Sequence, residues 1–155
     1  MKGTDLMKHL KAEFFIPDLK GTNQQTVLEE LTGPLAAGGF IKSRGIVLET
    51  LDKRETFAST GIGRGVAIPH CRTLVVSDVH IVVGISKKGV EYNASDGKKV
   101  HLFFLIVAPP VDTSNLYLPI LGRIVELVRD AKLRQAMMGA ETFPALAKIL
   151  QGVTA

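Results

Sequence analysis

The segment KVHLFFLIVA, residues 99–108, and the segment VHIVVGIS, residues 79–86, are two long apolar runs in this chain. Both are rich in β-branched or aromatic residues, and neither shows a clear alternation of apolar and polar side chains. A strand with one solvent-facing side alternates, whereas a strand covered on both faces does not. The two segments therefore predict buried strands in a sheet that is covered on both sides.

The segments upstream of these strands carry helical patterns. Thr22, with Gln25 three residues later, predicts the start of a helix with a capping box. The pair at residues 33–34, Gly-Pro, predicts a kink or a break in that helix. Ser43 predicts the cap of a second helix that runs to about Glu55.

The segment after the Pro-Pro pair at residues 109–110 is also predicted to be helical. Its apolar face comprises Leu116, Ile120, Ile124 and Leu127. Residues 112–114 offer several N-caps, and two shorter helices are predicted near residues 132–138 and 143–150. Short strands are predicted within AEFFIPDL and GVAI. Strands interleaved with helices predict the α/β class: a single-domain α/β sandwich over residues 1–155, with a small mixed sheet and helices on both faces.

Composition and charge exclude several classes of protein. The chain has 155 residues, of which 46% are hydrophobic and 22% charged, and its net charge is +4. The basic residues are scattered rather than gathered in a stripe, which argues against a nucleic-acid partner. A mildly basic surface remains suited to an anionic ligand such as phosphate.

The single cysteine and the absence of long apolar segments indicate the cellular compartment. Cys71 is the only cysteine, so the chain can form neither an internal disulfide nor a zinc site of several thiolates. The N-terminal residues lack the apolar core of a signal peptide. The apolar run at residues 102–108 is too short to cross a bilayer as a helix. These features predict a cytoplasmic protein without direct membrane insertion.

The segment STGIGRGVAIPHCR, residues 59–72, contains three closely spaced glycines. Its glycine spacing does not fit a dinucleotide-binding fingerprint, and the segment lacks the lysine and Ser/Thr of a P-loop. A simple reading is that Gly61, Gly63 and Gly65 allow positive φ in a tight loop.

His70 at the end of this segment favours a chemical role. An imidazole with an ordinary pKa is mostly neutral and nucleophilic at pH 7. Guanidinium groups, which bind phosphate oxygens, lie nearby in the sequence at Arg54, Arg64 and Arg72. The glycine-loop N–H groups and the hydroxyls of Ser59 and Thr60 complete a predicted anion cradle. These residues predict a phosphate-handling His70.

Other candidate sites are weaker. Cys71 adjoins His70, but neighbouring residues of an extended segment point to opposite faces, so Cys71 is predicted to fill space in the core. His9, His80 and His101 show no metal-ligand spacing, and no metal or cofactor site is predicted.

The segment RETFASTGIGRGVAIPHCR resembles the signature of bacterial phosphotransferase system enzyme IIA domains of the fructose/mannitol type, which include the nitrogen-regulatory IIA proteins. The resemblance also covers KGTNQQTVLEEL, GIVLETLDKRE, DGKKVHLFFLIVAPP and LRQAMMGAETFPALAKIL. It implies that the histidine of the Pro-His pair, His70, accepts a phosphoryl group. It implies that Arg54 helps to hold that group and that Thr60, Gly61 and Gly63 match the family's loop.

Three positions depart from the family's pattern. Arg64 stands where asparagine is common, and it is either an additional phosphate clamp or simply an exposed charge. Cys71 replaces a small residue. Asn115 stands where many members carry a second histidine, and an asparagine can donate a hydrogen bond to a phosphoryl oxygen but carries no positive charge. The predicted phosphoryl-stabilising residues are therefore Arg54, Thr60, Gly61, Gly63, Arg64, Arg72 and Asn115.

The resemblance implies a phosphotransferase that receives its phosphoryl group from an HPr-like phosphocarrier protein. The group then passes to a IIB domain or serves as a regulatory mark, and the nitrogen-regulatory type is favoured over the sugar-transport type. The Asn115 departure supports an alternative, in which the same fold is a non-catalytic protein-binding module.

Overall fold

β6 (Val100–Ala108) is the central strand of the fold, which the computed structural model describes for residues 6–111 and 115–152. The sheet has six strands among these residues, in the order β1-β5-β6-β3-β2, and β4 also pairs with β6. The remaining strands are β1 (Phe15–Ile16), β2 (Gly61–Gly63), β3 (Val66–Ala67), β4 (His70–Arg72) and β5 (His80–Val90). β6 runs antiparallel to β5 but parallel to β3 and β4, so the sheet is mixed, as predicted.

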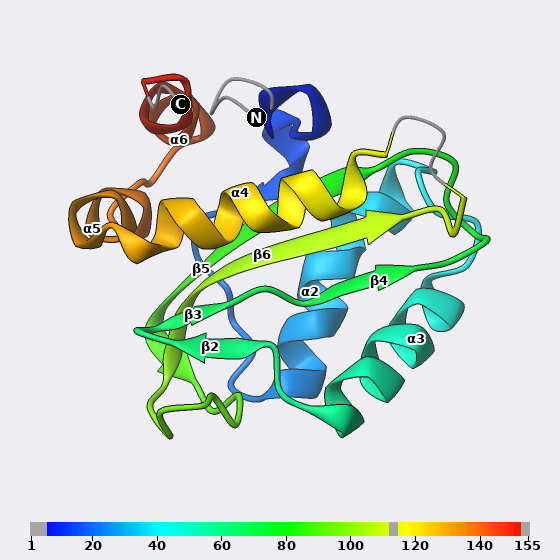
Figure 1. Cartoon of the computed structure of the whole chain (residues 1–155), viewed down its shortest axis with the longest axis horizontal. Coiled ribbons are helices and arrows are strands. Elements are labelled where there is room, and N and C mark those ends of the chain that lie inside the picture. Colours follow the sequence, from blue (N-terminus) through cyan, green and yellow to red (C-terminus); the bar gives the residue numbers. More distant parts are fainter. Residues whose placement is uncertain (1–5, 112–114, 153–155) are drawn as a thin grey trace.

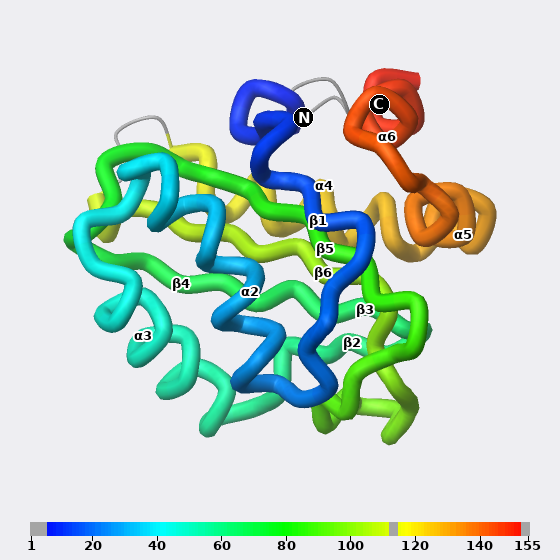
Figure 2. Tube along the Cα trace, turned by 180° about the vertical axis from the view of Figure 1, so that it is seen from behind, coloured from blue at the N-terminus to red at the C-terminus, as the bar shows by residue number. Residues whose placement is uncertain are grey.

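Helices cover both faces of the sheet (Figures 1 and 2). α2 (Gln24–Ala37) and α3 (Arg44–Phe57) lie on one face. α4 (Tyr117–Arg129), α5 (Ala131–Met138) and α6 (Phe143–Gln151) lie on the other, with the short 3-10 helix η1 (Met7–His9). A second 3-10 helix, η2 (Ala12–Phe14), precedes β1. No helix in the described part of the chain is long and apolar enough to cross a membrane.

The lack of alternation in β6 follows from this two-sided cover. Leu102, Phe104 and Ile106 pack in the core beneath α4, whereas Phe103 and Leu105 pack in the core beneath α2 and α3. All five side chains are at most 1% exposed. Both sides of the strand are thus removed from water, and apolar residues are favoured at every position. The predicted α/β sandwich is confirmed.

α2 begins one residue later than predicted and is not broken. Asn23, not Thr22, is the N-cap: its side chain accepts the Thr26 N–H at 3.0 Å, and the Thr26 hydroxyl accepts the Asn23 N–H at 3.3 Å. Asparagine and threonine therefore form the reciprocal pair that was predicted for Thr22 and Gln25. Pro34 lies in the last turn of α2, which continues to Ala37, so the predicted break is wrong.

The other helix predictions agree with the structure. Ser43 caps α3 by accepting the Ile46 N–H at 3.1 Å, and α3 ends at Phe57 rather than near Glu55. Thr142 caps α6 in the same way. The N-caps predicted at residues 112–114 lie outside the described residues.

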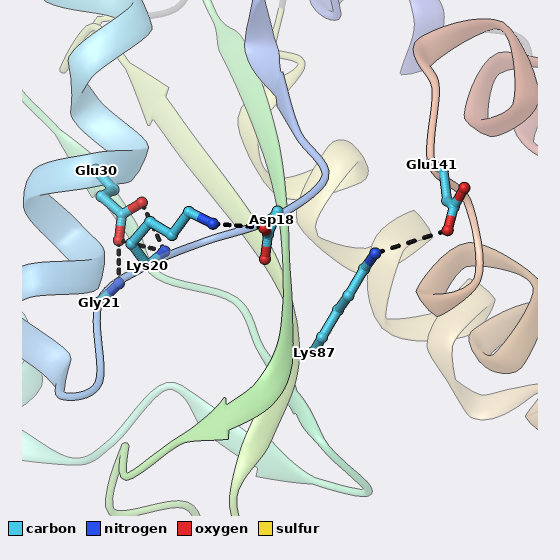
Figure 3. Close-up of polar contacts among 6 residues, drawn as sticks. All are labelled: Asp18, Lys20, Gly21, Glu30, Lys87 and Glu141. Atoms are coloured by element: carbon cyan, nitrogen blue, oxygen red, sulfur yellow. Dashed lines mark hydrogen bonds and ion pairs between the residues drawn. The ribbon is translucent and has the colours of Figure 1, made fainter.

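Polar contacts join the connecting segments to the helices and the sheet (Figure 3). The Glu30 carboxylate on α2 accepts the backbone N–H of Lys20 at 2.9 and 3.0 Å, and also that of Gly21. These bonds hold the connection between β1 and α2. On the other face, Nζ of Lys87 in β5 forms an ion pair with Oε1 of Glu141, 3.6 Å away, in the connection between α5 and α6.

Replacement by alanine is expected to have opposite effects on stability at two glycines, Gly122 and Gly39, that both have open space around them. No atom lies within 4 Å of a Cβ built on Gly122 in α4 or on Gly39, but Gly39 has a φ of +74°. Gly122→Ala should stabilise the protein by about 0.5–1 kcal/mol, because glycine loses more backbone entropy in a helix than alanine does. Gly39→Ala should destabilise it by about 1 kcal/mol, because a Cβ is strained in the left-handed region. Urea denaturation of both variants tests this, and shifts of the same sign would contradict it.

Candidate functional site

His70 is the first residue of β4, beside the second half of β6, where it pairs with Ile106. The chain reaches β4 directly from β3, and the Ile106 N–H donates to the Pro69 carbonyl at 3.0 Å. The side chain of His70 is half-buried. Its ring is therefore held by the sheet yet remains open to solvent on one side.

A hydrogen bond to the backbone fixes the tautomer of His70. Its Nδ1 lies 2.6 Å from the carbonyl oxygen of Ile68. Because a carbonyl can only accept, Nδ1 carries the proton, and in the neutral ring the lone pair lies on Nε2. The geometry thus presents Nε2 as the nucleophilic atom.

The surroundings of His70 lower its pKa from the usual 6.5. Burial is the largest cause, because it disfavours the charged ring, and the positive charge of Arg54 acts in the same direction. The bond to Ile68 and the charge of Glu55 oppose these effects in part. The imidazole is therefore neutral at pH 7, as a nucleophile must be.

We predict that the titration midpoint of His70 lies below 6.5 and that Arg54→Met raises it, since that variant removes a nearby positive charge. The folded state should also lose stability as the pH falls below 6.5, because the unfolded chain binds this proton first. Proton NMR of the His70 ring across the pH range measures the titration midpoint in the wild type and in Arg54→Met. A midpoint at or above 6.5, or one that Arg54→Met leaves unchanged, would contradict the prediction.

Arg54 lies at the C-terminal end of α3, where its Nη1 donates to the Ala58 carbonyl at 3.1 Å. The next residue, Glu55, is buried and accepts the Thr60 N–H at 2.9 Å, the Thr60 hydroxyl, and the Tyr92 hydroxyl at 3.0 Å. These bonds tie the end of α3 to the segment that leads to His70. The structure thus directs the Thr60 hydroxyl to Glu55, not toward His70.

Arg72 and Asn115 lie on the side of His70 that faces α4. The guanidinium carbon of Arg72 is 4.3 Å from the centre of the Tyr117 ring, and the ring centres of Tyr117 and His70 are 6.3 Å apart. Asn115, with a φ of 54°, lines a surface hollow together with Arg72 and Tyr117. The structure therefore brings His70, Arg54, Arg72 and Asn115 to one region of the surface.

The structure does not bring the glycine segment around His70. Residues 61–63 form β2, which pairs antiparallel with β3. The hairpin turn contains Arg64 and Gly65, and the Gly65 carbonyl accepts the His101 and Leu102 N–H groups at the start of β6. His70 pairs with Ile106, four residues further along β6 than Leu102. At the usual rise per residue, these two positions on β6 are about 13 Å apart. Gly63 and Arg64 thus lie at the far end of the hairpin, and Gly61, which pairs with Ala67, lies between the two ends.

The structure gives Cys71, His9 and His101 surroundings that fit a role in stabilising the fold. Cys71 is buried on the face toward α2 and α3, and burial raises its pKa to about 12. Nδ1 of His9 bonds to the Val79 carbonyl at 3.2 Å, and Nδ1 of His101 bonds to that of Ser86 at 2.8 Å. Within the described residues, no group of three or more His, Cys, Asp or Glu side chains could hold a metal ion.

Sequence reasoning missed Tyr117 and Tyr92. Tyr117 contacts both His70 and Arg72 across the space between β4 and α4, and Tyr92 donates to the buried carboxylate behind Arg54. Tyr117 follows Asn115 by two residues at the start of a helix that the sequence did predict, but only the packing of α4 against β6, the strand beside β4, brings its ring to His70. No local pattern marks either residue.

Residues 8–153 match the family described as "Phosphoenolpyruvate-dependent sugar phosphotransferase system, EIIA 2". The fructose-specific EIIABC component of Bacillus subtilis is 33% identical over 133 residues, which make up 86% of this chain but only 21% of that protein. The nitrogen regulatory protein of Pseudomonas aeruginosa is 31% identical over 137 residues, 88% of each chain. The fructose-specific EIIA component of Haloferax volcanii is 26% identical over 153 residues, 99% of each chain.

Solved structures show the same arrangement of elements. The nitrogen regulatory protein IIA-Ntr from Neisseria meningitidis superposes with a TM-score of 0.84 at 27% identity, over 92% of this chain and 97% of that one. IIA mannitol from Escherichia coli, at 17% identity, shares the fold with a TM-score of 0.76, over 91% of this chain and 98% of that one. A family match over nearly the whole length, supported by these relatives, shows that the chain belongs to the EIIA 2 family of the phosphoenolpyruvate-dependent sugar phosphotransferase system.

Proposed function

We propose that this protein is a cytoplasmic phosphocarrier that accepts a phosphoryl group on Nε2 of His70 from the phosphohistidine of an HPr-like protein. The observation that carries the proposal is the 2.6 Å bond between Nδ1 of His70 and the Ile68 carbonyl, which leaves the Nε2 lone pair available. The lowered pKa of the half-buried ring supports it, because the ring is unprotonated at neutral pH.

The transfer is a direct exchange between two imidazoles. The Nε2 lone pair of His70 attacks phosphorus while the phosphorus–nitrogen bond of the protonated donor ring breaks, and the donor leaves as a neutral imidazole. His70 keeps its Nδ1 proton and becomes a phosphorylated imidazolium, whose positive N–H is stabilised by the Ile68 carbonyl. Protons and charge balance, and the step needs no nucleotide or other cofactor.

The surrounding side chains supply charge for the transferring group. Phosphoryl transfer is catalysed mainly by positioning and by stabilisation of oxygen charges. Arg54 acts electrostatically on His70, and Arg72 leaves the same face of β4 as His70. We assign direct stabilisation to Arg54 and Arg72, and a hydrogen bond to Asn115. Thr60 and Gly61 shape the segment before His70, while Gly63 and Arg64 lie too far away to contact the phosphoryl group.

Exposed apolar side chains around the site suit a docking partner. Phe57 at the end of α3, Leu74 two residues after Arg72, and Leu118 beside Tyr117 are 88%, 85% and 64% exposed, respectively. A transient interface needs such contacts around a reactive group that both proteins can reach. An HPr-like donor and a IIB domain would use this surface in turn. One fold neighbour, enzyme IIA mannitol of Escherichia coli, has been solved in complex with phosphorylated enzyme IIB mannitol.

Within this family we favour the nitrogen-regulatory branch, in which the phosphoryl group serves as a regulatory mark. The likenesses to the Pseudomonas and Neisseria proteins support this branch, while the fructose-specific Bacillus and Haloferax proteins support sugar transport as the alternative. A second candidate, a non-catalytic protein-binding module, is supported by Asn115, which cannot carry positive charge.

The test is phosphorylation of the purified protein with phosphoenolpyruvate, enzyme I and HPr. The expected product carries one acid-labile phosphoryl group, seen as a mass increase that disappears at low pH. If several competent HPr-like donors, each shown to phosphorylate another IIA protein, produce no such increase, the phosphocarrier role is overturned in favour of the binding module. Subsequent transfer to a fructose-type IIB domain would favour transport over regulation.

A further inference from the structure

Tyr117, the first residue of α4, borders two functional side chains of the site. Its ring centre is 6.3 Å from that of His70, with the planes at 54°, and 4.3 Å from the guanidinium carbon of Arg72. Tyr117 itself is only 7% exposed, so α4 and the core beneath it fix the position of the ring. One immobile aromatic surface therefore contacts both the proposed acceptor and a neighbouring positive charge.

The geometry of β4 explains why one ring can contact both side chains. His70 and Arg72 are two residues apart in the strand, so their side chains leave the same face, whereas Cys71 points into the opposite core. Two residues of a strand span about 6.6 Å, which an extended arginine side chain can bridge. Arg72 is thus within reach of a group attached to His70, provided that its mobile side chain is kept nearby.

A stacked aromatic ring restrains a guanidinium in the required way. Cation–π contact holds the guanidinium plane over the ring and leaves its N–H donors at the edge, available for phosphoryl oxygens. Burial is the main reason that the pKa of Tyr117 is raised to about 12, so the phenol stays neutral and does not cancel the charge of Arg72.

We propose that Tyr117 is a positioning residue for phosphoryl transfer: its ring holds the Arg72 guanidinium beside His70, where Arg72 stabilises the transferring and the bound phosphoryl group. This role rests on the proposed phosphocarrier function. Tyr117 acts through Arg72 and through the face of its ring, so the ring and not the hydroxyl is the essential part.

The test compares Tyr117→Phe, Tyr117→Leu, Arg72→Ala and the double variant Tyr117→Leu/Arg72→Ala. The readouts are kcat and KM with phosphorylated HPr as donor, and the lifetime of the phosphohistidine. Arg72→Ala should lower kcat roughly tenfold and shorten the lifetime, because a charged hydrogen bond to the phosphoryl group is lost. Tyr117→Leu should lower kcat roughly fivefold, the worth of an exposed cation–π contact, with KM unchanged.

Comparison of the single variants with the double variant tests whether Tyr117 acts through Arg72. Tyr117→Phe should behave as the wild type, and the double variant should be no worse than Arg72→Ala, since Tyr117 acts through Arg72. Ile46→Ala, which changes an exposed apolar side chain in the first turn of α3, at the opposite end of that helix from Arg54, is the control and should leave kcat and the phosphohistidine lifetime unchanged. Multiplying effects in the double variant, or a Tyr117→Phe variant as slow as Tyr117→Leu, would overturn the proposal. Circular dichroism confirms folding, and Arg72→Lys gives a second test at an exposed position, with an expected loss between those of wild type and Arg72→Ala.

A separate measurement does not depend on phosphorylation. Nitrogen-15 relaxation of the Arg72 Nε–H should show a restrained side chain in the wild type and in Tyr117→Phe, and a mobile one in Tyr117→Leu. Equal mobility in all three would overturn the positioning role even where His70 is phosphorylated. A wild type that is not phosphorylated but keeps Arg72 restrained would instead count against the proposed function alone.

Discussion

Replacing His70 with glutamine is expected to abolish phosphoryl acceptance completely. Glutamine is similar in size and polarity but has no nucleophilic nitrogen, so no phosphorus–nitrogen bond can form at this position. The half-buried position of His70 at the start of β4 makes a large loss of stability unexpected. Intact-protein mass spectrometry after incubation with phosphoenolpyruvate, enzyme I and HPr measures the effect, with the wild type as the positive reference.

Two control variants give this result its meaning. His101→Gln changes a histidine whose Nδ1 also bonds to a backbone carbonyl, that of Ser86, and it should be phosphorylated like the wild type. Cys71→Ser removes the adjacent thiol, which is buried with a raised pKa and should play no part. A phosphoryl group retained by His70→Gln, or lost in His101→Gln, would place the acceptor elsewhere.

Most of the fold was predictable because its signals are local. The central strands are continuous apolar runs, and Ser43 caps α3 with its own side chain three residues before the N–H that it accepts. The misplaced start of α2 is a competition between neighbours: Thr22 and Asn23 both suit an N-cap, and Asn23 is favoured because Thr26 completes its capping box. Pro34 was tolerated because it lies in the last turn of α2, close to where the helix ends.

The site was only partly predictable, because residues that are close to His70 in the sequence are not always close to it in the structure. Arg64 is six residues from His70, but the chain between them is extended, so the intervening residues separate the two. Arg54 is sixteen residues away, yet α3 ends close enough to His70 for the Arg54 charge to act on the ring. Tyr117 comes from a distant helix. Helix and strand assignments alone could not supply these distances, which depend on how α3 packs against β4 and how α4 packs against the neighbouring strand β6.

Glu55→Ala is expected to destabilise the protein by about 2–4 kcal/mol, because it leaves buried hydrogen-bond donors without an acceptor. The donors that lose their acceptor are the Thr60 N–H, the Thr60 hydroxyl, the Tyr92 hydroxyl and, at 3.4 Å, the Gln24 side-chain amide. Burial is the main cause of the raised pKa of Tyr92, so its phenol stays protonated and must donate. Urea denaturation at pH 7 measures the loss.

Glu49→Ala is the matched control for this effect, since it removes the same side chain from the same helix. Glu49 is exposed and forms an i,i+4 ion pair with Lys53 at 3.2 Å, so its removal should cost no more than about 0.5 kcal/mol. Comparable losses in the two variants would show that the Glu55 bonds are not what holds the end of α3. If Glu55 does hold it, Tyr92→Phe should cost less in Glu55→Ala than in the wild type, because the phenol has already lost its acceptor. Phosphoryl acceptance should slow in Glu55→Ala even where the protein remains folded, because the carboxylate holds the segment that leads to His70 against the end of α3, where Arg54 lies.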